Sequence, residues 1–145
     1  MYLIINGPNL NLLGKREPEI YGDTSFEDYL PRLREDFPDE EIVYFQSNIE
    51  GEIVDALQEY GFRTDCRGIV INPGGYSHYS VAIADTISAI PAPVVEVHIS
   101  NIHSREECRR HTVTGAKARG IIAGLGLDGY RLALSWLMEK VKIKK

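Results

Sequence analysis

Cysteine is scarce in this chain, and its scarcity excludes two classes of protein. Only Cys66 and Cys108 occur among 145 residues. Two cysteines are too few for the disulfide framework of a small secreted domain. Their spacing matches no metal-binding pattern, and we interpret them as packed or incidental thiols rather than as nucleophiles. We therefore expect a fold that is stabilised by its own hydrophobic core.

Long apolar runs are also missing. No segment approaches the ~18 consecutive apolar residues of a membrane span, and the N-terminus lacks the basic region and apolar stretch of a signal peptide. We therefore expect a cytoplasmic protein. With 43% hydrophobic and 26% charged residues, the composition is typical of a single globular domain, residues 1–145, with a sizeable core.

An excess of positive charge is absent as well. The net charge of −5 disfavours nucleic acid as a partner, and we expect no membrane partner. A small anionic substrate would be opposed by the overall charge, so attraction would have to come from locally placed arginines and helix N-termini. We interpret the one basic segment, Lys140–Lys145, as the solvated end of a helix.

Short β-rich runs alternate with longer amphipathic stretches. Strands are predicted at Tyr2–Ile5, Glu41–Gln46, Gly68–Ile71, Pro93–His98 and Gly120–Ala123. Helices are predicted at Ser25–Phe37, Glu50–Tyr60, Ser77–Ala89, Ser104 to about Arg110, and Leu127 to about Lys142. Two helix starts fit the hydroxyl-x-x-acid capping box, namely Thr24 or Ser25 with Glu27 or Asp28, and Ser104 with Glu107.

This alternation indicates βαβ units and a parallel sheet that is covered by helices on both faces. Five strands predict an α/β, flavodoxin-like three-layer sandwich with the strand order 2-1-3-4-5, although another order stays open. In the predicted order, a ligand crevice would lie at the carboxyl ends of the first and third strands, where the order reverses.

A long segment without helical or strand periodicity, Asn6–Gly22, follows the first strand. Most connections have about 4 to 6 residues, and longer ones are often lids or binding loops. Glycines at both ends of Gly14–Gly22, which we call the arm, would let it swing. The arm carries one cation and one phenol, Arg16 and Tyr21.

The fourth strand ends in an acid and a histidine. Glu96 and His98 are two residues apart, so they share one face of the strand, and a charged pair that closes a run of valines is costly unless it is paired or used. A carboxylate beside an imidazole can fix its tautomer and suits a general acid. A solvated strand end is the alternative.

The third strand leads into Asn72-Pro73-Gly74-Gly75, a turn that exposes backbone N–H groups and could cradle an oxyanion or carboxylate. Asn72 offers an amide and His78 a ring donor. Asp85 lies about two helical turns beyond His78, on a similar face. Asn72 could also be only a turn former, and Asp85 only a solvated helix acid.

Arginines are concentrated on the predicted short helix after the fourth strand, at Arg105, Arg109 and Arg110. Arg105 and Arg109 are four residues apart, so they would share a helix face on which one could bind a carboxylate bidentately. Isolated surface arginines are the alternative.

Two further patterns do not support cofactor or metal chemistry. Gly124–Gly129 matches G-x-G-x-x-G, but only 16 residues follow it, whereas a dinucleotide site needs a further strand and an acid about 20 residues on. We interpret these glycines as tight strand-to-helix packing. His98, His103 and His111 lack a metal-ligand pattern. We predict neither a metal nor a cofactor.

The remaining inventory favours acid–base chemistry on a small polar anion, since no serine elbow, P-loop or activated lysine is present. A non-enzymatic flavodoxin-like binding or signalling module is the main alternative. A receiver-type module, however, would need clustered acids where this chain has asparagines. A different lyase that uses the same anion site is a third reading.

The motifs, taken in order, resemble the type II 3-dehydroquinate dehydratases. They are Asn6–Gly14 with Arg16–Pro18 and Tyr21–Gly22, Gln46–Asn48 with Glu50–Glu52, Asn72–Tyr76 with His78, Glu96–Asn101, and Gly124–Gly126 with Gly129–Tyr130. The resemblance covers nearly the whole chain. Two positions depart from it: Ile49 stands where histidine is expected, and Cys108 where phenylalanine is commoner.

The resemblance implies a flavodoxin-like fold and a dodecamer of four trimers. It also implies a cofactor-free, reversible dehydration of 3-dehydroquinate to 3-dehydroshikimate through an enolate, in the shikimate pathway or in quinate catabolism. By position, Tyr21 would be the base, stabilised by Arg16. His98 would be the acid, oriented by Glu96, and Asn9 would position a water or hydroxyl. The implied substrate-binding residues are Asn72, His78, Asp85, Ile99, Ser100 and Arg109.

A tyrosine base needs electrostatic help, because an isolated phenol is almost fully protonated at neutral pH. A guanidinium within hydrogen-bonding reach favours the phenolate. Arg16, on the same arm, is the nearest such cation in the sequence. We expect the arm to become ordered when a ligand fills the crevice.

Overall fold

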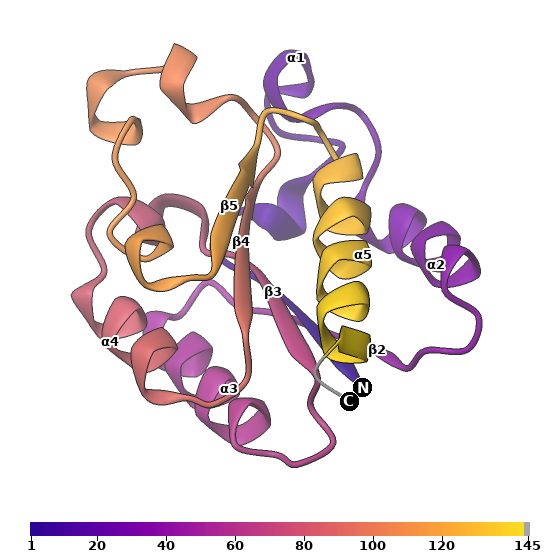
Figure 1. Ribbon diagram of the computed structural model, residues 1–145. Coiled ribbons are helices and arrows are strands. Elements are labelled where there is room, and N and C mark those ends of the chain that lie inside the picture. The colour runs from indigo at the N-terminus through magenta and orange to yellow at the C-terminus, as the bar shows by residue number, and fades with distance from the viewer. Residues whose placement is uncertain (144–145) are drawn as a thin grey trace.

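The computed structural model describes residues 1–143 and contains one five-stranded parallel sheet (Figure 1). Its strands are β1 (Tyr2–Asn6), β2 (Ile42–Gln46), β3 (Gly68–Asn72), β4 (Val94–His98) and β5 (Gly120–Ala123). They lie in the order β2-β1-β3-β4-β5. The predicted order is confirmed, and the predicted strand ends differ from the observed ones by one residue at most.

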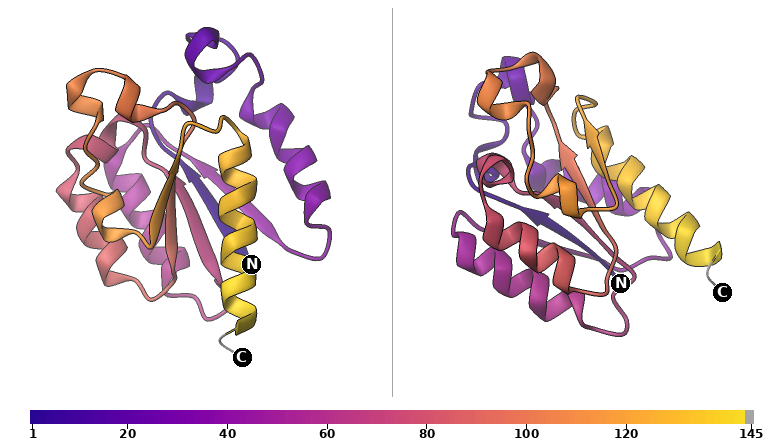
Figure 2. Two further views of the ribbon diagram at one scale, coloured as in Figure 1. Left: turned by 45° about the horizontal axis from the view of Figure 1, so that its top comes forward. Right: turned by 60° about the vertical axis from the view of Figure 1, so that its left-hand side comes forward.

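Helices cover both faces of the sheet (Figures 1 and 2). The helices α2 (Phe26–Asp36) and α5 (Asp128–Ile143) lie on one face, and α3 (Glu50–Gly61) and α4 (Val81–Ala89) lie on the other. Successive strand side chains point to opposite faces. Tyr2 and Ile4 of β1 therefore join the core under α2 and α5, whereas Leu3 and Ile5 join the core under α3 and α4.

Serine side chains set the starts of two helices. The Ser25 Oγ accepts the Asp28 N–H at 3.1 Å, which confirms the predicted cap of α2. The helix predicted to start at Ser77 begins only at Val81, because the Ser80 Oγ accepts the Ile83 N–H at 3.0 Å and caps α4. Residues Gly74–His78 form a separate 3-10 helix, η2.

The prediction of a helix from Ser104 to about Arg110 is wrong. Two single turns stand there instead, η3 (Ile102–Ser104) and η4 (Glu107–Arg109), separated by extended backbone. The Ser104 hydroxyl donates to the Asn101 carbonyl at 2.9 Å, so it closes the preceding turn rather than capping a following helix. A segment this short has too few internal hydrogen bonds to offset the cost of nucleating a helix.

The segment predicted to lack helical periodicity contains two short turns, η1 (Leu10–Leu12) and α1 (Pro18–Tyr21). Leu10 and Leu13 are buried and anchor it to the core. Gly14 and Gly22, at the ends of the arm, have positive φ angles of 90° and 84°. In Figures 1 and 2 the arm and the part of the β4–β5 connection (residues 99–119) that contains η3 and η4 rise side by side above the same edge of the sheet.

The remaining predictions concern the glycines after β5, the two cysteines, the basic tail and membrane spans. A Cβ at Gly129 would lie 3.0 Å from the Val97 Cγ1, as expected if the glycines between β5 and α5 serve tight helix–sheet packing. Cys66 is buried, Cys108 is exposed, and both are free. Of the predicted basic tail, the last two lysines lie outside the described residues. Within residues 1–143, no helix combines the length and the apolar character needed to cross a membrane.

Candidate active site

A cavity of about 100 Å³ lies at the carboxyl ends of β1, β3 and β4, below the arm and the β4–β5 connection. Nine of the eleven predicted site residues line it: Asn9, Arg16, Tyr21, Asn72, His78, His98, Ile99, Ser100 and Arg109. Glu96 lies behind His98, and Asp85 lies elsewhere. Residues that are up to 100 positions apart in the sequence therefore converge on one small volume.

A fully buried tyrosine orients the amide of Asn72. Tyr130, in the first turn of α5, donates its hydroxyl to the Asn6 Oδ1 at 2.7 Å and accepts the Asn72 Nδ2 at 3.0 Å. The Asn72 Oδ1 accepts the Gly74 N–H at 3.1 Å. Burial raises the pKa of Tyr130, so the phenol keeps its proton. The second N–H of the Asn72 amide is left to donate to a ligand.

Glu96 and His98 form the pair predicted from the strand pattern. Glu96 is fully buried and His98 is 5% exposed, and the His98 Nε2 lies 2.9 Å from the Glu96 Oε2. Two further donors, the hydroxyls of Thr112 and Thr114, bind the same carboxylate. Their backbone segment belongs to the β4–β5 connection.

His78 faces the other side of His98, with their ring centroids 6.1 Å apart. Its Nδ1 lies 2.7 Å from the backbone carbonyl of His111, which requires the proton on Nδ1. Burial lowers the pKa of His78 and outweighs that hydrogen bond; the neighbouring His98 lowers it further. A neutral His78 leaves Nε2 as an acceptor, which suits a ligand hydroxyl better than a ligand carboxylate.

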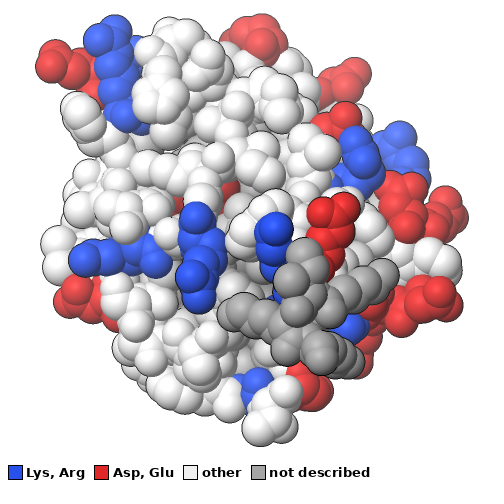
Figure 3. Space-filling model, viewed as in Figure 1, with Lys and Arg blue, Asp and Glu red and all other residues white. Residues whose placement is uncertain are grey.

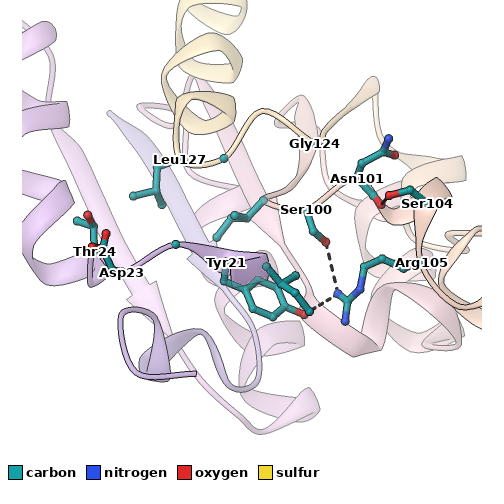
Figure 4. Close-up of a pocket in the computed structure, with 13 residues that line it drawn as sticks. Tyr21, Asp23, Thr24, Ser100, Asn101, Ser104, Arg105, Gly124 and Leu127 are labelled. Carbon is teal, nitrogen blue, oxygen red and sulfur yellow. Dashed lines mark hydrogen bonds between the residues drawn. The ribbon is translucent and has the colours of Figure 1, made fainter. Parts of the chain in front are cut away.

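The cation that reaches the hydroxyl of Tyr21 is Arg105. Its Nη1 donates to the Tyr21 Oη at 2.6 Å and lies 3.4 Å from the Ser100 Oγ (Figure 4). Arg16, the predicted partner, instead places its guanidinium 5.0 Å from the centre of the Tyr21 ring and its Nε 3.4 Å from Glu17. Arg105 crosses from the β4–β5 connection to the arm, which no local sequence pattern indicates.

Arg109 and Asn9 are held by neighbours outside the cavity. The Arg109 Nε lies 2.6 Å from the Glu106 Oε2. Because the predicted helix is replaced by two turns, Arg105 and Arg109 do not share a helix face, yet both line the cavity. Asn9 has a left-handed φ of 68°, and its N–H donates to the Asn48 Oδ1 at 3.0 Å.

Asp85 is exposed on α4 and does not line the cavity of its own chain. The helix face predicted for it and His78 does not exist, because α4 begins only at Val81, after His78. Asp85 is thus the one predicted substrate-binding residue that this chain does not bring to the others.

A second, more open cavity of about 530 Å³ adjoins the first. Tyr21, Ser100 and Arg105 separate the two, and Asn101, Gly124 and Leu127 line the far side, among others (Figure 4). On the molecular face shown in Figure 3, acidic side chains gather over α2, and others lie at the top of the view, where the arm and the β4–β5 connection stand.

Four residues have roles in the site that the sequence does not predict: Arg105, Thr112, Thr114 and Tyr130. The sequence shows the cluster of three arginines but not the phenol that one of them binds. For the threonines, the available signal was the buried acid Glu96, which needed donors from somewhere.

Comparisons with known proteins find similar sequences and structures over nearly the whole chain. The family described as "Dehydroquinase class II" matches residues 1–138. A 3-dehydroquinate dehydratase of Bacillus licheniformis is 51% identical over 94% of each chain, and one of Thermotoga petrophila is 52% identical over 97% of this chain and 96% of its own. A solved type II dehydroquinase from Propionibacterium acnes superposes with a TM-score of 0.87 at 47% identity, over 94% of each chain.

Proposed function

The chain belongs to the class II dehydroquinase family, and from this premise we propose that it is a hydro-lyase that dehydrates 3-dehydroquinate to 3-dehydroshikimate, with Tyr21 as the base and His98 as the acid. One observation carries the proposal. The phenol of Tyr21, bound by a guanidinium, and the imidazole of His98, bound by a carboxylate, line the same small cavity.

The base step removes the proton next to the substrate ketone. The Tyr21 oxygen takes that proton, and the electrons of the C–H bond form an enolate. The proton must first leave the phenol, and the Arg105 N–H at 2.6 Å stabilises the negative charge that remains on the oxygen. Arg16, over the face of the same ring, adds a weaker attraction to an electron-rich ring.

The acid step expels the hydroxyl group. The enolate electrons form the carbon–carbon double bond as the C–O bond breaks, and His98 gives a proton to the departing oxygen, so that water leaves. Glu96 stabilises the imidazolium from which that proton comes. After the reaction Tyr21 holds one proton more and His98 one proton fewer, and exchange with solvent restores both.

The other cavity residues suit a small polyhydroxylated acid. Asn72 presents an N–H whose direction is fixed by Tyr130 and Gly74. His78 offers an acceptor for a hydroxyl. Arg109 presents cationic N–H groups that can bind hydroxyl or carboxylate oxygens. We retain Asn9, Ile99 and Ser100 in their implied roles, since all three line the cavity.

Asp85 fits this function only as a residue of a second copy. It is exposed on α4, outside the cavity of its own chain, whereas the resemblance assigns it to substrate binding. We therefore propose a homo-oligomer, the dodecamer of four trimers that the resemblance implies, in which Asp85 of one subunit completes the cavity of another. We also propose a cytoplasmic location and a role in the shikimate pathway or in quinate catabolism.

A direct assay tests the activity. Purified protein should convert 3-dehydroquinate to a product with conjugated-enone absorbance. Tyr21→Phe and His98→Ala should each lower kcat by ~10²-fold or more, the scale of general acid–base catalysis, without loss of the fold by circular dichroism. Wild-type protein that gives no rise in absorbance at high enzyme concentration would refute the assignment. A Tyr21→Phe enzyme of normal turnover would remove the phenol from the mechanism.

Mixed oligomers test the role of Asp85. Tyr21→Phe and Asp85→Asn proteins, each impaired alone, should regain activity after they are unfolded and refolded together, because some cavities then receive an intact Tyr21 and an intact Asp85 from different subunits. A mass measurement in solution gives the oligomeric state. A monomer, or mixtures that stay inactive, would contradict the shared site.

A further inference from the structure

We propose that Thr112 and Thr114 are positioning residues for the acid step: their hydroxyls hold the Glu96 carboxylate against His98 and so keep the imidazole in one tautomer. The inference rests on the proposed function, since it assigns the two threonines to the histidine that acts as the acid. Neither threonine lines the cavity, so both would act through Glu96.

The hydrogen bonds around Glu96 fix which groups donate protons to its carboxylate. The Thr112 Oγ1 accepts the Gly115 N–H at 3.0 Å and lies 2.6 Å from the Glu96 Oε2, to which it donates. The Thr114 Oγ1 donates to the Glu96 Oε1. Both carboxylate oxygens therefore accept hydroxyl protons, which is the pattern of an ionised carboxylate.

This pattern determines which nitrogen of His98 bears a proton. The Glu96 Oε2 that lies 2.9 Å from the His98 Nε2 is an acceptor, so Nε2 must be the donor. In the neutral ring the proton stays on Nε2, and Nδ1 is the nitrogen that exchanges a proton with the substrate. Without the threonine hydroxyls the carboxylate could rotate or take up a proton, and either change would release the imidazole.

The backbone around the threonines also joins the β4–β5 connection to η2. The N–H groups of Val113 and Thr114 lie 2.8 and 3.4 Å from the carbonyl of Ser77, which is buried in η2. A Cβ at Gly115 would come within 2.7 Å of the Glu96 Oε2. The backbone at Gly115 therefore approaches Glu96 so closely that it leaves no room for a side chain at this position.

Isosteric variants separate the hydroxyl from the shape of the side chain. Thr112→Val and Thr114→Val remove the hydroxyl but keep the branching, whereas the serine variants keep the hydroxyl. Each valine variant should lower kcat by about 10-fold or more, with little change in KM, because this is the change in rate that corresponds to the free energy of one hydrogen bond to a charged group. The serine variants should retain most of the turnover. Thr86→Val is the control, because the buried Thr86 donates to the Ala82 carbonyl at 2.9 Å on α4.

A second readout does not depend on turnover. In protein with ¹⁵N-labelled histidine, the His98 signals of the wild type should show a protonated Nε2 and an unprotonated Nδ1 at high pH. Thr112→Val and Thr114→Val should shift these signals toward exchange between the two tautomers, and the Thr86→Val control should leave them unchanged. Thermal unfolding of all variants reports any loss of stability, and Thr112→Val alone decides if the more buried Thr114→Val does not fold.

The outcomes distinguish the two proposals. Wild-type protein without dehydratase activity would refute the proposed function, while the histidine signals would still test the tautomer. Active wild type together with valine variants of unchanged kcat and unchanged His98 signals would refute the role of the threonines. A fall in kcat that Thr86→Val reproduces would also refute it, because the effect would then be one of general stability.

Discussion

Removal of the Arg105 guanidinium tests which cation activates the base. The Arg105 Nη1 donates to the Tyr21 Oη at 2.6 Å, whereas Arg16 contacts only the ring, 5.0 Å from its centre. We predict that Arg105→Gln lowers kcat far more than Arg16→Gln does. Glutamine keeps polar character and most of the side-chain length while it removes the charge.

The two geometries differ in expected magnitude. A hydrogen bond to a charged group contributes about 1.5–3 kcal/mol, and about 1.4 kcal/mol corresponds to a tenfold change in rate. Loss of Arg105 should therefore lower kcat roughly 10- to 100-fold. A partly exposed cation over an aromatic face contributes about 0.5–1 kcal/mol, so loss of Arg16 should lower kcat only about 2- to 5-fold.

The assay is steady-state dehydration of 3-dehydroquinate, followed by enone absorbance, with kcat and KM determined separately. Arg110→Gln is the matched control, because Arg110 belongs to the same connection but is exposed and does not line the cavity. Arg105→Lys should recover part of the loss, since lysine keeps a positive charge but lacks the planar fork.

The reverse order of effects would refute the reasoning. If Arg16→Gln abolished turnover and Arg105→Gln retained it, the cation adjacent in sequence would be the activating one. The 2.6 Å contact of Arg105 would then serve only to hold the arm. A parallel loss in Arg110→Gln would point to a general electrostatic effect of the connection.

Three further predictions concern protonation, packing and the arm. Burial lowers the pKa of His78, so its NMR titration midpoint should fall below the ordinary value of about 6.5. As the pH falls, His78 is protonated in the unfolded chain before it is protonated in the folded one. The stability contributed by neutral His78 is therefore complete above pH ~6.5 and is lost as the pH falls toward the folded-state pKa. Gly115→Ala should destabilise the protein by about 1–3 kcal/mol in chemical denaturation, because the new Cβ would lie 2.7 Å from a Glu96 oxygen, and an unchanged unfolding midpoint would contradict the close packing. Binding of an anionic enolate mimic should slow hydrogen exchange in Lys15–Gly22, and equal exchange with and without the mimic would argue against a lid.

The sequence predicted most of the architecture because hydrophobic pattern and strand–helix alternation are local properties. The valines before Glu96 and the apolar run before Asn6 each indicate a strand that is buried on both faces, and such strands fit only a sheet covered by helices. The short helix predicted around Ser104 failed for the opposite reason. Ser104 and Glu107 have the spacing of a capping box, but the hydroxyl of Ser104 donates to the carbonyl of Asn101, which precedes it in the chain. A seven-residue segment has few other interactions that could stabilise a helix.

By itself, the sequence determined which chemical groups stand at the ends of the strands and which two of them, Glu96 and His98, must share a face. Only the tertiary structure decided that Arg105 rather than Arg16 reaches the phenol of Tyr21, and that Asp85 is exposed outside the cavity of its own chain. The physical reason is the separation in sequence of the residues that make contact. Periodicity reports contacts between residues a few positions apart, whereas a hydrogen bond across 84 residues depends on how two long loops pack above the same sheet edge.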